Sequence, residues 1–214
     1  MRSPLVQARL PREFYNRQTD VVARDLLGKA LIRRWNDQWL GGWIVETEAY
    51  LPCDDASSHS HRGRTASNAA MFMKPGTLYV YPIHAKYCLN AVTECEGRGS
   101  AVLIRAIEPV WGVDHIAQHR KLNDPRRWTR GPAMLCQALA VDRKLDQIDL
   151  VTDENITIVS GVEITRVTTS PRIGISTATD LPLRFFVDGN RFVSGRAGDH
   201  RARPNESLTH YTAD

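Results

Sequence analysis

Residues 43–50 carry two glutamates and a tyrosine at spacings that could support acid–base chemistry. Their composition is typical of a strand, whose side chains alternate between two faces, so Glu46, Glu48 and Tyr50 are expected to share one face. Strand residues two apart are separated by roughly 6.5–7 Å, and partial burial would let each carboxylate raise the pKa of the other. This arrangement suits a general base, although two ordinary surface acids would give the same pattern.

An aromatic cluster follows these acids in the sequence. In the strand-like segment LYVYPIH, alternation places Tyr79 and Tyr81 on one face and His84 on the other. A flat ring system binds well between aromatic faces, at about 1–3 kcal/mol per stacked base. Tyr50, His59 and Tyr81 could therefore hold a purine, whereas burial in an ordinary strand is the better interpretation of Tyr79.

The bulk composition is that of a soluble, single-domain globular protein. The chain has 214 residues, of which 42% are hydrophobic and 24% charged, and its net charge of +4 favours a polyanionic partner. No apolar run approaches the roughly 20 residues of a membrane span, and the first residues lack a secretory signal. We therefore expect no membrane association and a cytoplasmic location, at the nucleoid of a bacterium or in the nucleus of a eukaryote. The four cysteines show no CxxC spacing and are expected to be reduced thiols.

The first half of the chain predicts the elements that would position the acids. A short helix is predicted over residues 19–27. Strands are predicted at 30–35 and 39–50, on either side of a polar turn at 36–38. Residues 51–70 are expected to form a long polar loop.

Further strands and helices follow. The strand candidates are residues 78–84, 87–92, 101–107, about 156–167 and about 183–194, the last containing a turn at 188–190. Helical patterns cover about 110–121 and 132–140. Pro82 marks its strand as an edge or bulged strand. The fold class predicted is mixed α+β, a single domain with a mainly antiparallel sheet and peripheral helices.

Five blocks of sequence resemble one known family in their order and spacing: WIVETEAYL, MFMKPGTLYVY, VLIRAIEP, RGPAMLCQALAV and PLRFFV. Over residues 14–193 the chain resembles the alkyladenine, or 3-methyladenine, DNA glycosylases of animals and bacteria. The resemblance implies a curved antiparallel sheet in a single mixed α/β domain that uses no cofactor. Its extent suggests a basic tail at residues 1–13, a glycosylase domain at 14–194 and a polar, mobile tail at 195–214.

The resemblance also implies a catalytic group. Glu48 would be the general base that positions and deprotonates the attacking water, and Glu46 would be a supporting acid. Arg105, in the block VLIRAIEP, matches an arginine near the water and the target phosphate. A lyase mechanism needs an amine nucleophile in the pocket, and the nearby Lys86 lies in a different segment. Direct attack by water without a covalent enzyme intermediate is therefore expected.

The same resemblance implies a pocket for a base flipped out of DNA. Tyr50 would stack on one face of the base, and His59 with Tyr81 would close the other. Asn90 matches the position that clashes with the exocyclic amine of normal guanine. Alkylation at a ring nitrogen leaves an electron-poor, cationic purine that stacks well and departs readily. A neutral lesion such as hypoxanthine would depend more on its placement.

Two positions depart from the family in the hairpin that enters the minor groove. His84 stands where animal members have an intercalating tyrosine; its imidazole can stack, but it covers less area and gains charge below about pH 6.5. Lys86 stands near a family methionine and is either a phosphate contact or a solvated turn lysine. The segment between His84 and Asn90 is one residue shorter than in the family.

Two further clusters allow alternative interpretations. Residues 119–130 hold five arginines or lysines against one acid, and Arg126, Arg127 and Arg130 are candidate phosphate contacts unless this is a solvated loop. His115 and His119 have the i, i+4 spacing of zinc ligands on a helix. Because no third ligand is evident, exposed helix histidines are the favoured interpretation, and no metal is expected.

Taken together, these patterns predict a monofunctional DNA glycosylase of base excision repair. It would act as a monomer on double-stranded DNA that contains damaged purines of the 3-methyladenine class, with hypoxanthine and ethenoadenine left open. One alternative is a non-catalytic protein that binds damaged DNA, although the glutamate at position 48 speaks against it. A zinc-dependent hydrolase that uses the histidines is a third hypothesis.

Overall fold

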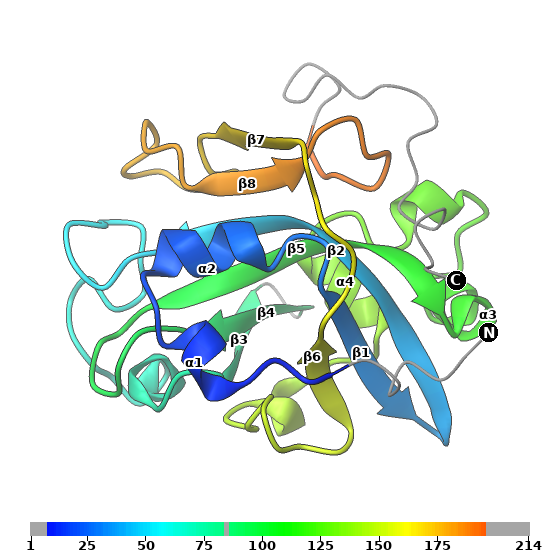
Figure 1. The fold of residues 1–214 in the computed structure, drawn as a ribbon, viewed down its shortest axis with the longest axis horizontal. Helices are drawn as coiled ribbons and strands as arrows, with labels where there is room; N and C mark the ends of the chain where they lie inside the picture. Colours follow the sequence, from blue (N-terminus) through cyan, green and yellow to red (C-terminus); the bar gives the residue numbers. More distant parts are fainter. Residues whose placement is uncertain (1–7, 84–85, 196–214) are drawn as a thin grey trace.

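A curled antiparallel sheet forms a half-barrel at the centre of the protein (Figure 1). The structure is a computed structural model and describes residues 8–83 and 86–195. In this part of the chain the sheet has eight strands, in the spatial order β3-β4-β5-β2-β1-β6, with β8 paired to both β2 and β7. The strands are β1 (Ala30–Trp35), β2 (Gln38–Tyr50), β3 (Leu78–Ile83), β4 (Lys86–Val92), β5 (Ala101–Trp111), β6 (Ile156–Val159), β7 (Val167–Ser170) and β8 (Arg184–Val187).

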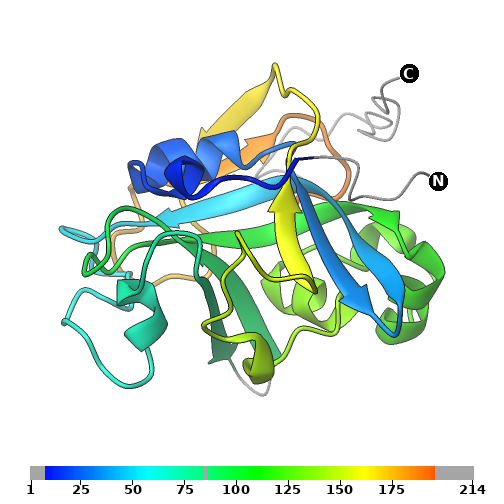
Figure 2. The same ribbon diagram turned by 60° about the horizontal axis from the view of Figure 1, so that its bottom comes forward.

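Short helices cover both sides of the sheet. The described residues form α1 (Arg12–Tyr15), α2 (Thr19–Asp25), α3 (Val113–Arg120) and α4 (Pro132–Ala138), and the 3-10 helices η2 (Ala69–Phe72), η3 (Pro125–Arg127) and η4 (Arg143–Leu145). Helix α2 packs on β2, whereas α4 packs on β4 and β5 and carries α3 on its other side. Figure 2 shows α1 and α2 on one side of the sheet and α3 and α4 on the other. The predicted mixed α+β class with an antiparallel sheet is confirmed.

Strand β2 is the strand on which the sheet is organised. Along one edge it pairs with β5 over residues 41–50. Along its other edge it pairs first with β1, as far as Trp43, and then with β8, from Glu46 onward. A register shift separates Ile44 from Glu46, where this change of partner occurs. As a result, Glu46 and Glu48 lie on the stretch of β2 that has β5 on one side and β8 on the other.

A second irregularity lies in β5, opposite these acids. Glu46 pairs with Ala106 and the next residue, Thr47, pairs with Ile104, so Arg105 is left without a partner in the ladder. Such a bulge bends the strand and changes the direction of a side chain. Here it turns Arg105 toward the carboxylates of β2.

Several sequence-based expectations for these elements are confirmed. The hairpin of β1 and β2 turns at Asn36 and Asp37, which both have positive φ, of 45° and 61°, as a tight two-residue hairpin turn requires. The helix at residues 19–25 ends before Gly28, whose φ is 80°. Strand β3, which contains Pro82, lies at the edge of the sheet, where the missing N–H of proline is tolerated.

Other boundaries were predicted wrongly. The helix expected over 110–121 begins only at Val113, because β5 continues to Trp111 and Gly112 adopts a left-handed conformation, with φ of 63°. The long strand expected over 156–167 is two short strands, β6 and β7, joined by an irregular segment. The strand expected over 183–194 ends at Val187, at the turn that was expected inside it.

The chain already packs against the sheet before residue 14. Arg9 forms an isolated β-bridge with Val159, and the Leu10 amide donates to the carbonyl oxygen of Ile158. The Leu10 side chain is buried in the core. None of the helices in the described part of the chain has the length and hydrophobicity needed to cross a bilayer.

The close approach of β2 to β5 gives a test of this fold. A Cβ atom added at Gly42 would lie 1.8 Å from the carbonyl oxygen of Glu108, so Gly42→Ala must push the two central strands apart. We expect it to lower the free energy of unfolding by about 3 kcal/mol or more, measured by urea denaturation. In Gly97→Ala the added atom meets nothing within 4 Å, and the left-handed backbone should cost only about 1–2 kcal/mol. Equal losses in the two variants would show that this contact does not constrain the sheet.

Candidate active site

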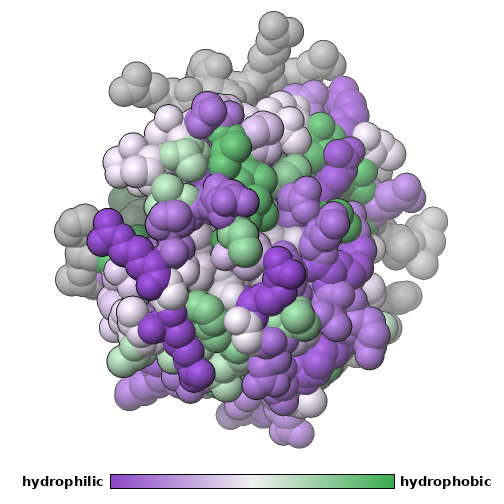
Figure 3. All heavy atoms as spheres, turned by 90° about the vertical axis from the view of Figure 1, so that its left-hand side faces the viewer, coloured by the Kyte–Doolittle hydropathy of each residue, from purple (hydrophilic) through white to green (hydrophobic). Residues whose placement is uncertain are grey.

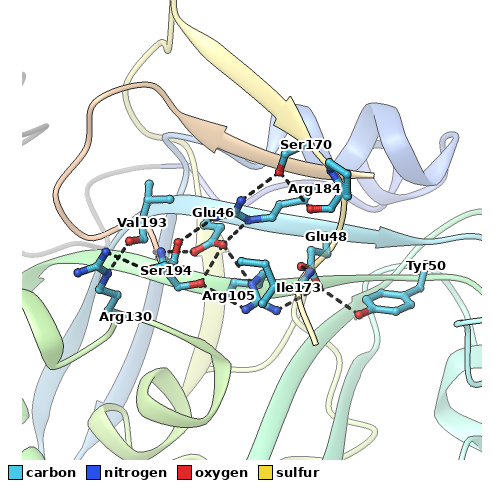
Figure 4. Close-up of polar contacts among 12 residues, drawn as sticks. Glu46, Glu48, Tyr50, Arg105, Arg130, Ser170, Ile173, Arg184, Val193 and Ser194 are labelled. Atoms are coloured by element: carbon cyan, nitrogen blue, oxygen red, sulfur yellow. Dashed lines mark hydrogen bonds and ion pairs between the residues drawn. The ribbon is translucent and has the colours of Figure 1, made fainter. Parts of the chain in front are cut away.

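Two carboxylates are completely buried side by side on β2. Glu46 and Glu48 have no solvent-exposed surface. Figure 4 shows both pointing into a network with Arg105 of β5 and Arg184 of β8. The alternation that predicted a shared face for these acids is confirmed, whereas the alternative of a solvated surface pair is wrong.

Glu46 accepts four hydrogen bonds, three of them at one oxygen. Its Oε1 accepts from Nε of Arg105 at 3.1 Å, from Nε of Arg184 at 2.7 Å and from Oγ of Ser194 at 2.9 Å, and its Oε2 accepts from the backbone amide of Ser194 at 2.7 Å. Burial by itself raises the pKa of Glu46, but the two arginines and these hydrogen bonds hold the pKa below its ordinary value. The expectation that the neighbouring carboxylate raises this pKa is therefore wrong for Glu46, because two cations lie closer.

Glu48 has a different set of partners. Its Oε1 accepts from the backbone amide of Ile173 at 2.8 Å, and its Oε2 accepts from the Arg105 guanidinium and the Tyr50 hydroxyl, each at 3.1 Å. A carboxylate offers about four acceptor positions. Among the described residues three donors reach Glu48, so one position remains on Oε1. Glu46 has four donors and Glu48 has three, and only Glu48 is bonded to the Tyr50 hydroxyl.

Arg105 connects the two acids. Its Nε and Nη1 donate to Glu46 and Glu48, and its Nη2 donates to Oγ of Ser194 at 3.3 Å. The side chain is almost fully buried. The structure therefore brings Arg105 to Glu48, as expected, while its contact with a phosphate stays a prediction.

An aromatic cavity of about 330 Å³ lies next to Tyr50. The rings of His59 and Tyr81 pack against each other with their centroids 4.1 Å apart, and Nδ1 of His59 is hydrogen bonded to the Tyr79 hydroxyl at 3.1 Å. Tyr50, His59 and Tyr81 all line this cavity, as the sequence predicted. Tyr79 is buried in agreement with its core interpretation, but it also lines the cavity.

Two surface loops frame this cavity. Residues from the loop after β2 and from the loop before β8 line it, and these loops lie at the left of Figure 1, in cyan and orange. Figure 3 shows this side of the molecule, whose surface is largely hydrophilic with small apolar islands. An aromatic lining below a hydrophilic face suits a flat ligand that is carried by a polar chain.

His59 is held in its neutral form. Burial lowers its pKa below the ordinary value for histidine, and no neighbouring charge offsets this effect. At neutral pH the imidazole therefore carries no charge that could repel a cationic ligand in the cavity.

Asn90 lies on β4 at the inner end of the cavity. It pairs with Tyr79 of β3, and its side-chain nitrogen donates to the Tyr79 carbonyl oxygen at 3.0 Å. This bond fixes the orientation of the amide next to the cavity lining. The pairing of β3 with β4 is continuous from Leu78 with Ala91 to Ile83 with Lys86.

The predicted intercalating residue, His84, lies outside the described residues, and its role stays a prediction. The described residues on either side of positions 84 and 85, Ile83 and Lys86, pair with each other. Lys86 is exposed at the first position of β4, consistent with either of its interpretations.

The three arginines expected at phosphates are not equivalent. Arg126 is exposed and forms an ion pair with Asp124 at 3.0 Å, and Arg127 is exposed. Arg130 instead donates to the carbonyl oxygens of Val193 at 2.6 Å and Gly195 at 3.2 Å (Figure 4). It thereby fixes the chain on both sides of Ser194, the residue that supplies two donors to Glu46.

The histidines of α3 do not form part of a metal cluster. Nδ1 of His119 is hydrogen bonded to the Ala138 carbonyl at 2.9 Å, and its ring packs edge-on against Trp35. Within residues 8–83 and 86–195, no three histidine, cysteine or acidic side chains are grouped so that they could hold a metal ion. These contacts give no support to a zinc-dependent hydrolase.

Several residues of the site were not predicted. Arg184 lies in the block PLRFFV, which could have indicated it, but the amides of Ile173 and Ser194 have no sequence signal, because any residue carries an amide. Arg172 and Asp55 form a buried ion pair beside Tyr50 and were missed, since they are 117 residues apart.

The fold is a curled half-barrel that places a buried acid beside an aromatic cavity. This combination is typical of an enzyme that binds a flat ligand in a pocket. Comparison with known sequences makes this specific, and the chain belongs to the methylpurine-DNA glycosylase family, whose sequence model matches residues 13–191. It is therefore a DNA glycosylase, a hydrolase of N-glycosidic bonds, and the family resemblance is confirmed.

Its relatives come from several groups of organisms. A protein of Rhodopirellula baltica named as a 3-methyladenine DNA glycosylase is 56% identical over 206 residues, which cover 93% of this chain and 88% of the relative. One from Koribacter versatilis, named likewise, is 46% identical, with 91% and 98% covered. The DNA-3-methyladenine glycosylase of Mus musculus is 42% identical, with 93% of this chain and 66% of the mouse protein covered.

The ion pair beside Tyr50 gives a test of the site's electrostatics. Burial alone raises the pKa of Asp55, but hydrogen bonds from Arg172 and from backbone amides hold it below its ordinary value. Its contribution to stability is therefore present above the unfolded pKa of about 3.9 and is lost as the pH falls through the lower folded pKa. Asp55→Asn should cost about 3–5 kcal/mol at pH 7, because it leaves Arg172 buried without a counter-ion.

The measurement is urea unfolding between pH 7 and pH 2. Asp55→Asn should lose less stability on acidification than the unsubstituted protein does. Asp37→Asn, which removes the acid of an exposed ion pair with Arg34, should leave the unfolding midpoint and its pH dependence nearly unchanged. Parallel pH profiles for the unsubstituted protein and Asp55→Asn would contradict the assignment.

Proposed function

We propose that this enzyme is a monofunctional glycosylase that flips alkylated purines of the 3-methyladenine class out of double-stranded DNA. The base enters the aromatic cavity, and a water activated by Glu48 attacks C1′ of its sugar. The observation that carries this proposal is the unfilled acceptor position on a buried carboxylate next to a cavity that fits a base.

The donors around the two acids support this division of roles. Glu46 is held by four donors, none of which belongs to a residue that lines the cavity, so it acts by holding Arg105 and by balancing charge. Glu48 can accept a hydrogen bond from water at Oε1 while its other contacts fix the carboxylate plane. A general base needs this combination of a defined orientation and a free lone pair.

The cavity supports recognition of a cationic purine. Tyr50 would stack on one face of the base, while His59 and Tyr81, which pack together, would close the other. Because His59 is neutral, the walls attract a positively charged ring through their π-systems without repelling it. Asn90, fixed by its bond to the Tyr79 carbonyl, would exclude the exocyclic amine of normal guanine.

The reaction as proposed needs no covalent enzyme intermediate. Among the described residues no lysine lines the cavity, so the amine that a lyase mechanism requires is not found there. The enzyme is proposed to act as a monomer. The cationic base leaves readily, whereas excision of hypoxanthine or ethenoadenine would depend on close placement against Glu48.

Contacts outside the cavity would hold the DNA. His84 at the hairpin tip is proposed to fill the gap that the flipped nucleotide leaves, and Lys86, Arg126 and Arg127 to contact phosphates. Arg130 would act mainly by holding the chain around Ser194, since its guanidinium donates to two carbonyl oxygens there.

Replacing Glu48 tests the proposed base. Glu48→Gln preserves the shape of the side chain but removes the charge that activates water. We expect single-turnover release of an alkylated purine from a duplex to fall by at least about 100-fold, with lesion affinity nearly unchanged. A non-catalytic binding protein would show no release before or after the substitution.

The matched control is Glu46→Gln. This variant leaves two buried arginines with less negative charge, so we expect it to lower the free energy of unfolding more than Glu48→Gln does. The fraction that stays folded should release base faster than Glu48→Gln. Equal single-turnover rates in the two variants would remove the reason for assigning the base to Glu48.

Salt dependence tests the phosphate contacts. Arg126→Ala with Arg127→Ala should weaken binding to lesion and undamaged duplexes alike and reduce the slope of log affinity against log salt by about 0.9 for each phosphate that is no longer neutralised. Arg24→Ala removes an exposed charge from α2, on the other side of the sheet from α3 and α4 (Figure 2), and should leave the slope unchanged. An unchanged slope in the double variant would make this segment an ordinary solvated loop.

A further inference from the structure

A buried ion pair with no part in the reaction described above lies against Tyr50. The side chains of Arg172 and Asp55 are 0% exposed and form two parallel hydrogen bonds of 2.7 Å. Nη1 of Arg172 also donates to the carbonyl oxygen of Ala49 at 2.9 Å. The guanidinium carbon lies 4.7 Å from the centre of the Tyr50 ring.

Stability alone does not account for this pair. Removing two charges from water is costly, and apolar side chains of similar volume often stabilise a fold as well or better. Nε of Arg172 is in addition buried without a hydrogen-bond partner among the described residues, which adds to the cost. What an apolar pair cannot provide is a flat cation of fixed orientation on the face of a ring.

The pair is connected to the proposed general base through two routes. The Tyr50 hydroxyl donates to Oε2 of Glu48, and the amide of Ile173, the residue next to Arg172, donates to Oε1. The same two-residue segment therefore contacts the ring that would stack on the base and the carboxylate that would activate water. Asp55 fixes this segment from the loop that carries His59.

We propose that Asp55 and Arg172 are positioning residues that lock the plane of the Tyr50 ring and keep its hydroxyl on Glu48. The proposal rests on the function proposed above and deepens it. Arg172 touches neither base nor water; it acts through Tyr50. With the ring locked, a flipped purine that stacks on it presents its glycosidic bond to the water at a fixed angle. A displacement of about 1 Å in such a geometry can cost on the order of 100-fold in rate.

The test is a double-mutant cycle in single-turnover base release, on a duplex with one alkylated purine. Arg172→Lys keeps the charge but loses the flat, two-pronged geometry, and should lower the rate constant about 10- to 100-fold at a nearly unchanged half-saturating enzyme concentration. In a Tyr50→Ala background the same substitution should change the rate clearly less than in the unsubstituted protein, because no ring remains to be positioned and only the route through the Ile173 amide is left. An equal loss in both backgrounds, or an unchanged rate in Arg172→Lys, overturns the proposal.

Two controls keep the outcome interpretable. Arg12→Lys alters another arginine–aspartate pair, with Asp149 at 2.6 Å, that does not line the cavity, and should leave the rate constant unchanged. If Arg172→Lys does not fold, Asp55→Glu replaces it in the same cycle, since it also keeps both charges while shifting the guanidinium.

The Glu48→Gln variant separates the two proposals. If Glu48→Gln releases base at the normal rate, the proposed function fails. If Glu48→Gln is inactive and the Arg172 and Tyr50 effects multiply independently, only the positioning role fails.

Discussion

The structure depends on the charge balance of two carboxylates that are completely buried next to each other. Glu46 and Glu48 together carry two negative charges, and Arg105 and Arg184 supply two positive ones within hydrogen-bond distance. Without these partners, burial would force the acids to take up protons. The surrounding sheet is irregular at the two acids. There β2 changes its partner from β1 to β8, and β5 bulges at Arg105.

This balance also explains how two similar acids come to have different chemistry. Of the two acids only Glu46 binds Arg184 and the chain around Ser194, and with Arg105 these partners hold its pKa below the ordinary value. Arg105 is shared, and it orients Glu48 without saturating it. The segment that positions Ser194 is fixed in turn by Arg130, so a residue expected to bind DNA serves the interior of the site.

The sequence predicted those parts of the site that depend on local periodicity. The shared face of Glu46, Glu48 and Tyr50 follows from alternation in one strand, and the hairpin before it follows from the turn at Asn36 and Asp37. The pKa shift of Glu46 could not be predicted in this way, because the partners that lower it come from β5, from β8 and from a backbone amide 148 residues away. The family resemblance, in contrast, grouped residues that are distant in the sequence and that the structure places around one cavity, while their contact with a base stays a prediction. The wrong predictions also concern features that depend on tertiary structure. The pattern at 156–167 predicted one strand, but the chain leaves the sheet after β6. One arginine of the basic segment, Arg130, is bonded to backbone carbonyls, which no local pattern indicates.

Arginines near the cavity orient the site, but an uncompensated positive charge there would repel a cationic ligand. Its aromatic walls and neutral His59 offer π-surface to a cationic purine. The two nearby arginines are each neutralised by carboxylates: Arg105 by the acid pair, and Arg172 by Asp55. Because these cations are compensated within the fold, they can orient Glu48 and Tyr50 without repelling a positively charged ring. Orientation by buried arginines and acceptance of a cation are thus compatible because each guanidinium is paired with a carboxylate.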